Sequence, residues 1–372
     1  MGRAMSAERR QLIETMRGGG QVVLATLVRT EGSSYRRPGA RLLLSPGKVG
    51  AGTISGGCLE GDLVQRAEWL TRSGAVLQHY STAFDDTAEI PYGLGCGGEL
   101  DVLLERCDTA EFAALREALE QSQGGRARRV ITWLPTEARP EMRRAVLAED
   151  GDVIFVSASV SVDELARASG TSDPAAETVF VEDLTPPQRL VICGAGEDAR
   201  PIALMSRLLG WTVTIADGRR LLARAERFPE ADEVQLLERP EELRIGCEDA
   251  VILMTHSYEQ DRALLQAALP ARPRYLGLLG ARHRSSLLVS EVALELGWTL
   301  EETCAGLHAP VGLDLGGDGP EAIALAAVAE IQACLQGRLA SSRQLSAADI
   351  MESVARGGAS TYLQAQCAMG ER

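Results

Sequence analysis

The sequence predicts an α/β protein with two main domains, a mixed α+β domain followed by a domain built on a parallel sheet flanked by helices. Three observations predict this fold class. Short apolar runs with strand character alternate with helical stretches over the 372 residues. Paired prolines in segment 183–188 interrupt the alternation. A strand, a glycine turn, a helix, a second strand and an acidic residue then follow in that order.

The composition is that of an ordinary globular protein. Hydrophobic residues make up 45% and charged residues 24%, which excludes disordered and fibrous classes. The formal net charge of −14 argues against nucleic acid or an anionic membrane as a partner. No apolar run approaches the roughly 20 residues that a membrane helix needs. The eight cysteines show no C-x-x-C spacing, so we expect no zinc site, no disulfide framework and a cytoplasmic location.

The first domain is expected at residues 1–184. Within the helix predicted from residue 58, Leu59, Leu63, Ala67 and Leu70 fall on one face. The predicted strands are 21–29, 41–45, 75–81, 99–105 and 152–157, and the predicted helices are 7–16, 58–72 and 111–121.

The second domain is expected at residues 189–338, before a polar tail at 339–372. Alternating strands and helices predict a parallel sheet. Pro320 and Glu321 suit the first turn of a further, structural helix. The predicted strands are 189–193, 212–216, 250–254 and 274–279, and the other predicted helices are 197–209 and 259–269.

The start of the second domain resembles a dinucleotide-binding turn of the Rossmann type. Gly194 and Gly196 permit a tight turn and close approach to a phosphate, and Asp217 stands where an acid that binds ribose is expected. Glu197 and Asp198, expected in the first helical turn, suit the helix dipole but would repel a pyrophosphate. A nucleotide site and an inherited fold with a modified pocket are both open, and we expect any NAD(P) binding to be weak.

The first functional cysteine predicted from the sequence is Cys58. It follows the turn glycines Gly56 and Gly57 at the start of a predicted helix. Backbone N–H groups and the positive helix end at such a position lower a thiol pKa. We therefore predict a reactive thiol in a glycine-rich turn.

The second is Cys96, which precedes Gly97 and Gly98 in a loop that has almost no side chains. A bulky ligand can approach a thiol in such a loop. Free cysteines are more often small buried hydrophobic residues, as we expect of Cys193 inside a strand. Glycine loops at the ends of elements are where sites are built, so we predict a functional role for Cys58 and Cys96.

The loop at residues 30–39 adds hydroxyls, N–H groups and the pair Arg36 and Arg37. The loop could bind an anion, or it could be an ordinary long hairpin. Taken by itself, the sequence of the loop favours the hairpin. The histidines show neither metal-ligand spacing nor a catalytic triad, so no catalytic residue is predicted.

Taken together, these motifs resemble the xanthine dehydrogenase accessory factors of the XdhC/CoxI family. The resemblance implies an N-terminal XdhC/CoxI-type domain, a Rossmann-like domain and association as a homodimer. It places the family's cysteine motifs on Cys58 and Cys96 and its glycine turn on Gly194 and Gly196, whereas Glu197 stands where many members have histidine. The segments that carry it are 24–44, 52–63, 93–105, 191–196, 217–220, 227–232, 275–282 and 309–331.

The resemblance implies a chaperone that binds the molybdenum cofactor (molybdopterin), supports its sulfuration and delivers it to a molybdenum hydroxylase. A cysteine desulfurase is then a further expected partner. Two other classes stay open: an NAD(P)-dependent oxidoreductase that uses the Rossmann-like domain, and a docking protein that has kept the fold without binding a cofactor.

Overall fold

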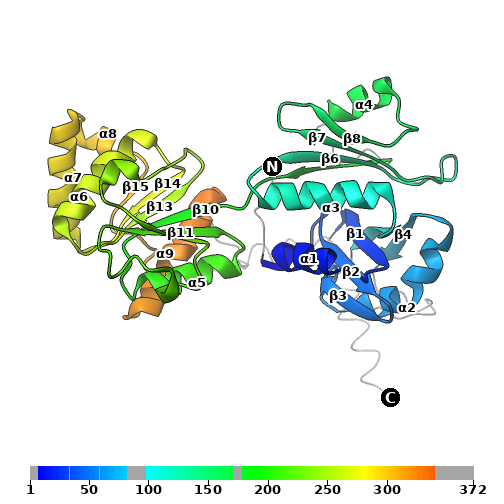
Figure 1. Ribbon diagram of the computed structural model, residues 1–372, viewed down its shortest axis with the longest axis horizontal. Coiled ribbons are helices and arrows are strands. Elements are labelled where there is room, and N and C mark those ends of the chain that lie inside the picture. Colours follow the sequence, from blue (N-terminus) through cyan, green and yellow to red (C-terminus); the bar gives the residue numbers. More distant parts are fainter. Residues whose placement is uncertain (1–6, 33, 58, 82–97, 171–177, 340–372) are drawn as a thin grey trace, which may run out of the picture.

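The computed structural model describes residues 7–32, 34–57, 59–81, 98–170 and 178–339 (Figure 1). Two lobes meet at the connection between strand β9 (Val179–Leu184) and strand β10 (Arg189–Cys193). The first holds two antiparallel sheets and the second a parallel sheet, so the predicted α/β fold class is confirmed. None of the helices in the described parts of the chain is long and apolar enough to cross a membrane.

The first antiparallel sheet has the strand order β3-β2-β1-β5-β4. Its alternating side chains pack on helix α2 (Glu60–Leu70) at one face and on α1 (Ala7–Gly18) and α3 (Ala110–Gln123) at the other. The strands are β1 (Val23–Glu31), β2 (Arg41–Ser45), β3 (Lys48–Gly52), β4 (Val76–Ser81) and β5 (Glu99–Arg106).

A second antiparallel sheet, in the order β8-β7-β6-β9, covers the other side of α3. Helix α4 (Val162–Ser169) packs on its outer face. Its remaining strands are β6 (Arg128–Trp133), β7 (Arg143–Ala148) and β8 (Val153–Val156). The first lobe is therefore a layered unit with α1 and α3 between two sheets.

Buried ion pairs join these two sheets. The Arg144 side chain on β7 donates to the Glu105 carboxylate on β5 over 2.8 and 2.9 Å, and both side chains are buried. Arg41 on β2 pairs with Glu182 on β9. Removing one partner of such a pair leaves a buried charge and costs about 3–5 kcal/mol.

The second lobe has a six-stranded parallel sheet in the order β12-β11-β10-β13-β14-β15, which is the Rossmann order 3-2-1-4-5-6. Helices α5 and α9 cover one face, and α6 and α7 the other. The further strands are β11 (Thr212–Asp217), β12 (Glu233–Leu236), β13 (Ala250–Leu253), β14 (Tyr275–Leu278) and β15 (Leu307–His308). The helices are α5 (Ala199–Leu208), α6 (Tyr258–Ala271), α7 (Arg282–Leu296), α8 (Leu300–Cys304) and α9 (Pro320–Leu335).

Two helix starts differ from the sequence prediction. Helix α2 begins at Glu60 rather than at residue 58, because a turn held by the Glu60 carboxylate precedes it. Helix α5 begins at Ala199 rather than at residue 197, so Glu197 and Asp198 belong to the turn. The prediction that these two carboxylates lie inside the first helical turn is therefore wrong.

Candidate functional site

The Ser-Gly-Gly turn between β3 and α2 is organised by one buried carboxylate. Glu60, the first residue of α2, points back into the turn that precedes it. Within the turn, the Ser55 hydroxyl also accepts from Leu59 N at 2.8 Å. The Glu60 carboxylate accepts from Thr53 Oγ1 at 2.7 Å, from Ile54 N, Ser55 N and Gly57 N at 2.9 Å each, and from the Ser55 hydroxyl.

Glu60 is ionised in this position. Burial by itself raises the pKa of Glu60, but hydrogen bonds from Ser55, Thr53 and Ile54 outweigh it and lower the pKa to about 2. At neutral pH its negative charge therefore holds several N–H groups in one conformation. Sequence reasoning missed Glu60, because an acidic residue at a helix start is ordinarily explained by the helix dipole.

The two turn glycines lie on the surface. Gly56 and Gly57 have φ angles of +81° and +125°, in the region that favours glycine, and both are exposed. An aromatic carbon of Tyr35 lies 3.5 Å from the position that a Cβ of Gly56 would take, so the loop before β2 lies against this turn. Cys58 itself lies outside the described residues.

Cys96 and Gly97 also lie outside the described residues, whereas Gly98 is buried directly before β5. The register places Glu31, the last residue of β1, opposite Glu99 of β5, and Glu99 opposite Ser81, the last residue of β4. Gly52, the last residue of β3, lies opposite Leu42 near the start of β2. The connections that follow β1, β3 and β4 therefore leave the same end of the sheet.

Charged side chains mark that end beside β4 and β5. Asp101 pairs with Arg29 over 3.2 Å and with His79 Nδ1 over 2.8 Å. These three residues, with Glu31 and Glu99, line a cavity of about 250 Å³. Among the described residues, no group of acidic, histidine and cysteine side chains has the geometry of a metal site.

In the second lobe, the glycine turn fits tightly against the neighbouring strand. A Cβ on Gly194, whose φ is +132°, would lie 2.4 Å from the carbonyl oxygen of Met254, so only glycine fits there. A Cβ on Gly196 would lie 2.4 Å from Asp198 Oδ1. The turn is thus shaped by close packing with the chain that follows β13.

Asp217, predicted to bind ribose, is buried at the end of β11 and already has protein partners. Its carboxylate accepts from Ala195 N at 2.7 Å and from Arg219 Nη2 at 2.7 Å and Nε at 2.9 Å. Burial opposes ionisation, but the hydrogen bonds from Arg219 and Ala195 lower the pKa of Asp217. A ribose hydroxyl would compete with Arg219 for this carboxylate.

Glu197 and Asp198 are each paired near the same turn. Asp198 Oδ2 lies 2.7 Å from His256 Nε2, and Glu197 pairs with Arg227. Arg227 also donates to the carbonyl oxygen of Ala195 over 3.1 Å. The carboxylates and their partners therefore surround the edge of the sheet where a dinucleotide pyrophosphate binds in this fold.

Comparison with known proteins covers both lobes. Residues 190–331 match the family model described as XdhC Rossmann domain, and residues 16–81 match that of the XdhC and CoxI family. A Bacillus subtilis protein, named as a probable xanthine dehydrogenase subunit, is 29% identical over 84% of this chain and 92% of its own length. The Escherichia coli molybdenum cofactor insertion chaperone PaoD is 27% identical over 86% of this chain and 85% of its own length.

A solved structure extends the comparison to the fold. A Bacillus halodurans protein described as a xanthine dehydrogenase superposes with a TM-score of 0.75 and 27% identity, over 93% of this chain and 99% of that one. The two family models, the relatives and the shared fold agree with one another. The chain belongs to the XdhC/CoxI family.

Proposed function

We propose that this protein is an accessory chaperone that binds the molybdenum cofactor, supports its sulfuration and delivers it to a molybdenum hydroxylase. The observation that carries the proposal is the Glu60-held turn, in which Gly56 and Gly57 expose backbone beside the position of Cys58. The similarity to a molybdenum cofactor insertion chaperone supports the same role.

The turn leaves room for a bulky, sulfur-ligated cofactor. Exposed glycine backbone allows a bulky group to approach a thiol. Because the turn is already held in one conformation, little conformational entropy is lost when the group binds. The connection that contains Cys96 runs from the end of β4 to the start of β5. Both lie at the end of the sheet where β3 leads into the Glu60-held turn. We therefore propose that Cys58 and Cys96, with Gly97 and Gly98, contact the cofactor or its transferable sulfur.

The partners belong to the proposal as well. A molybdenum hydroxylase would receive the cofactor, a cysteine desulfurase would supply sulfur, and the chaperone would act as a homodimer. A cytoplasmic location stays a prediction from the sequence. For NAD(P) we propose weak binding, since Asp217 is paired with Arg219 and two carboxylates lie beside the glycine turn.

The test is the cofactor content of protein purified from cells that make molybdopterin, measured as molybdenum and as the fluorescent oxidised pterin. We expect both in wild type, and transfer that activates an apo-hydroxylase. Cys58→Ser and Cys96→Ser should each lose most of the bound cofactor, whereas Cys247→Ser, an exposed thiol in the other lobe, should not. Wild type without pterin that activates no hydroxylase would refute the function. Full retention in both cysteine variants would refute only the site.

A further inference from the structure

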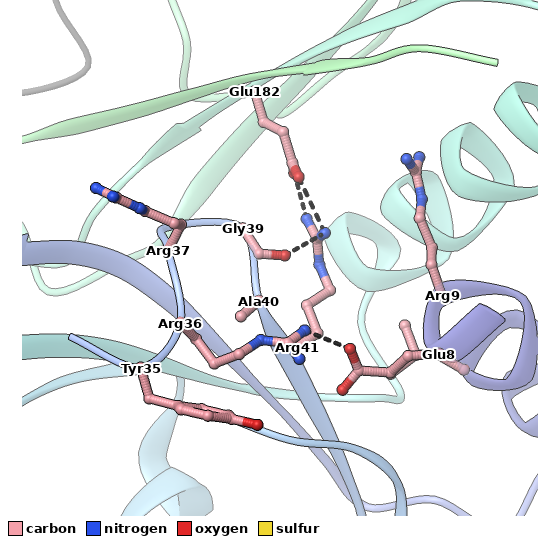
Figure 2. A pocket seen from close by; sticks show the side chains of 10 residues that line it. Glu8, Arg9, Tyr35, Arg36, Arg37, Gly39, Ala40, Arg41 and Glu182 are labelled. Carbon is pink, nitrogen blue, oxygen red and sulfur yellow. Dashed lines mark hydrogen bonds and ion pairs between the residues drawn. The ribbon is translucent and has the colours of Figure 1, made fainter. Parts of the chain in front are cut away.

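A cavity of about 400 Å³ lies between α1, the loop before β2, and β9 (Figure 2). Its volume is within the range of small-molecule sites. Arginines are its most frequent lining residue. Its charged residues are Glu8, Arg9, Arg36, Arg37, Arg41 and Glu182.

The cavity carries a surplus of positive charge. Four arginines face two glutamates, so the lining has a formal charge of +2 in a chain whose total is −14. Burial lowers the pKa of Arg9 to about 10, with Glu182 opposing this shift and Arg41 adding to it. The guanidinium groups of Arg9 and Arg41 therefore both lie near the single carboxylate of Glu182, which cannot neutralise both. An anion that enters the cavity would be attracted by the remaining positive charge.

The arginines differ in how firmly they are held. Arg41 is buried and donates to Glu182 and to the carbonyl oxygen of Gly39, so it joins the sheets and fixes the cavity wall. Arg36 pairs with Glu8, and both side chains are more than a fifth exposed. An incoming anion can replace Glu8 as the partner of Arg36 without breaking a buried pair.

The loop that carries Arg36 and Arg37 is positioned by its backbone. Leu27 N donates to Ala40 O over 2.9 Å, and Gly39 N donates to Leu27 O over 2.7 Å, which closes the base of the loop. Tyr35 of the same loop lies against Gly56. The cavity and the Glu60-held turn are thus adjoining parts of one surface.

We propose that this cavity binds a phosphate group through Arg36, whose side chain points toward Glu8, with Arg9, Arg37 and Arg41 supplying the surrounding positive charge (Figure 2). Guanidinium groups recognise phosphate oxygens by paired, charge-assisted hydrogen bonds. The identity of the ligand rests on the proposed function: molybdopterin is a phosphate monoester, so its phosphate would lie among the arginines and its sulfur end toward the turn.

The anion site is tested with inorganic pyrophosphate by titration calorimetry on the full chain. We expect wild type to bind it, and Arg36→Gln to weaken binding about tenfold, the equivalent of one charge-assisted hydrogen bond. Arg37→Gln should weaken binding less, because the Arg37 side chain points away from Arg36 and Arg41 (Figure 2). Glu8→Gln should act in the opposite direction and tighten binding a few-fold. Arg116→Gln, the same change at an exposed position of α3 outside the cavity, should have no effect.

Cofactor retention by the same variants tests the identity of the ligand. Loss of pterin from Arg36→Gln, at unchanged melting temperature, supports the assignment. Absence of pyrophosphate binding, or equal binding in wild type and arginine variants, overturns the anion site. Pterin retained while pyrophosphate binding is lost overturns the assignment to the cofactor. Pyrophosphate bound by a wild type that never carries pterin leaves the anion site and refutes the proposed function.

Discussion

Two glycine turns join a strand to a helix in this protein, one in each lobe, and a buried carboxylate accepts backbone N–H groups in both. In the first lobe Glu60 comes from the helix itself and leaves Gly56 and Gly57 exposed. In the second, Asp217 comes from the neighbouring strand and closes on Ala195 N and Arg219.

A glycine motif therefore predicts the shape of the backbone but not the ligand that binds there. The first turn presents exposed backbone next to a positive cavity. The second is packed against Met254 and flanked by Glu197 and Asp198. Of the two turns, the one outside the Rossmann sheet is therefore the more open to a ligand, since its glycines are exposed and are not packed against a neighbouring strand.

The largest expected effect separates the two turns by packing. Gly194→Ala should destabilise the protein by about 4 kcal/mol or more, because it adds a Cβ 2.4 Å from the Met254 carbonyl oxygen to the strain of a positive φ. Gly57→Ala has a similar φ but no atom within 4 Å of the added Cβ, so it should cost only about 1–2 kcal/mol. Urea unfolding measures both, and equal losses would contradict the packing difference.

The second effect concerns the carboxylate that holds the first turn. Glu60→Gln should destabilise by about 2 kcal/mol at pH 7, since the amide NH₂ would face N–H and O–H donors. The folded-state pKa of Glu60 is about 2, below its ordinary value of 4.5. The stabilisation is thus fully present above about pH 4.5 and is lost as the pH falls toward 2.

Unfolding of wild type and Glu60→Gln from pH 7 to pH 2 measures this difference. The gap in unfolding free energy should close as the pH falls. Glu68→Gln, an exposed position on the same helix, is the control and should follow wild type throughout. A gap that is constant with pH would mean that the charge of Glu60 does not hold the turn.

Sequence patterns predicted the parallel sheet and both glycine turns well because these depend on neighbouring residues. The strand Arg189–Cys193, the turn and α5 follow within twenty residues. The sequence did not predict strands β6 and β7. Each begins with two arginines, which interrupt the alternation of apolar and polar residues that indicates a strand. Arg144 is tolerated at a buried position of β7 because its side chain pairs with Glu105 on another sheet, a contact that no local pattern contains.

The sequence predicted only part of the candidate site as well. The sequence pointed to Gly56 and Gly57 by residue type, but for the loop with Arg36 and Arg37 it favoured an ordinary hairpin over an anion site. It did not indicate that Arg9 and Glu182 would join them, because these come from α1 and β9 and meet only after the two sheets have packed. Long-range ion pairs are set by the tertiary fold rather than by spacing along the chain.

The smallest expected effect is a gain of binding at the second turn. Glu197→Gln combined with Asp198→Asn removes two negative charges beside the glycine turn and releases Arg227 and His256 from their carboxylate partners. At roughly 0.5 kcal/mol for each removed charge in a solvent-exposed setting, NAD⁺ binding should tighten by about fivefold from a weak starting value. The arginine cavity could also attract the pyrophosphate of NAD⁺, so the comparison belongs in the Arg36→Gln, Arg37→Gln background. Fluorescence titration with NAD⁺ then reports on the second lobe alone.

Micromolar affinity before the charges are removed would show that Glu197 and Asp198 do not oppose the phosphate. An unchanged affinity after their removal would assign the weak binding to Asp217, whose pairing with Arg219 both substitutions leave intact.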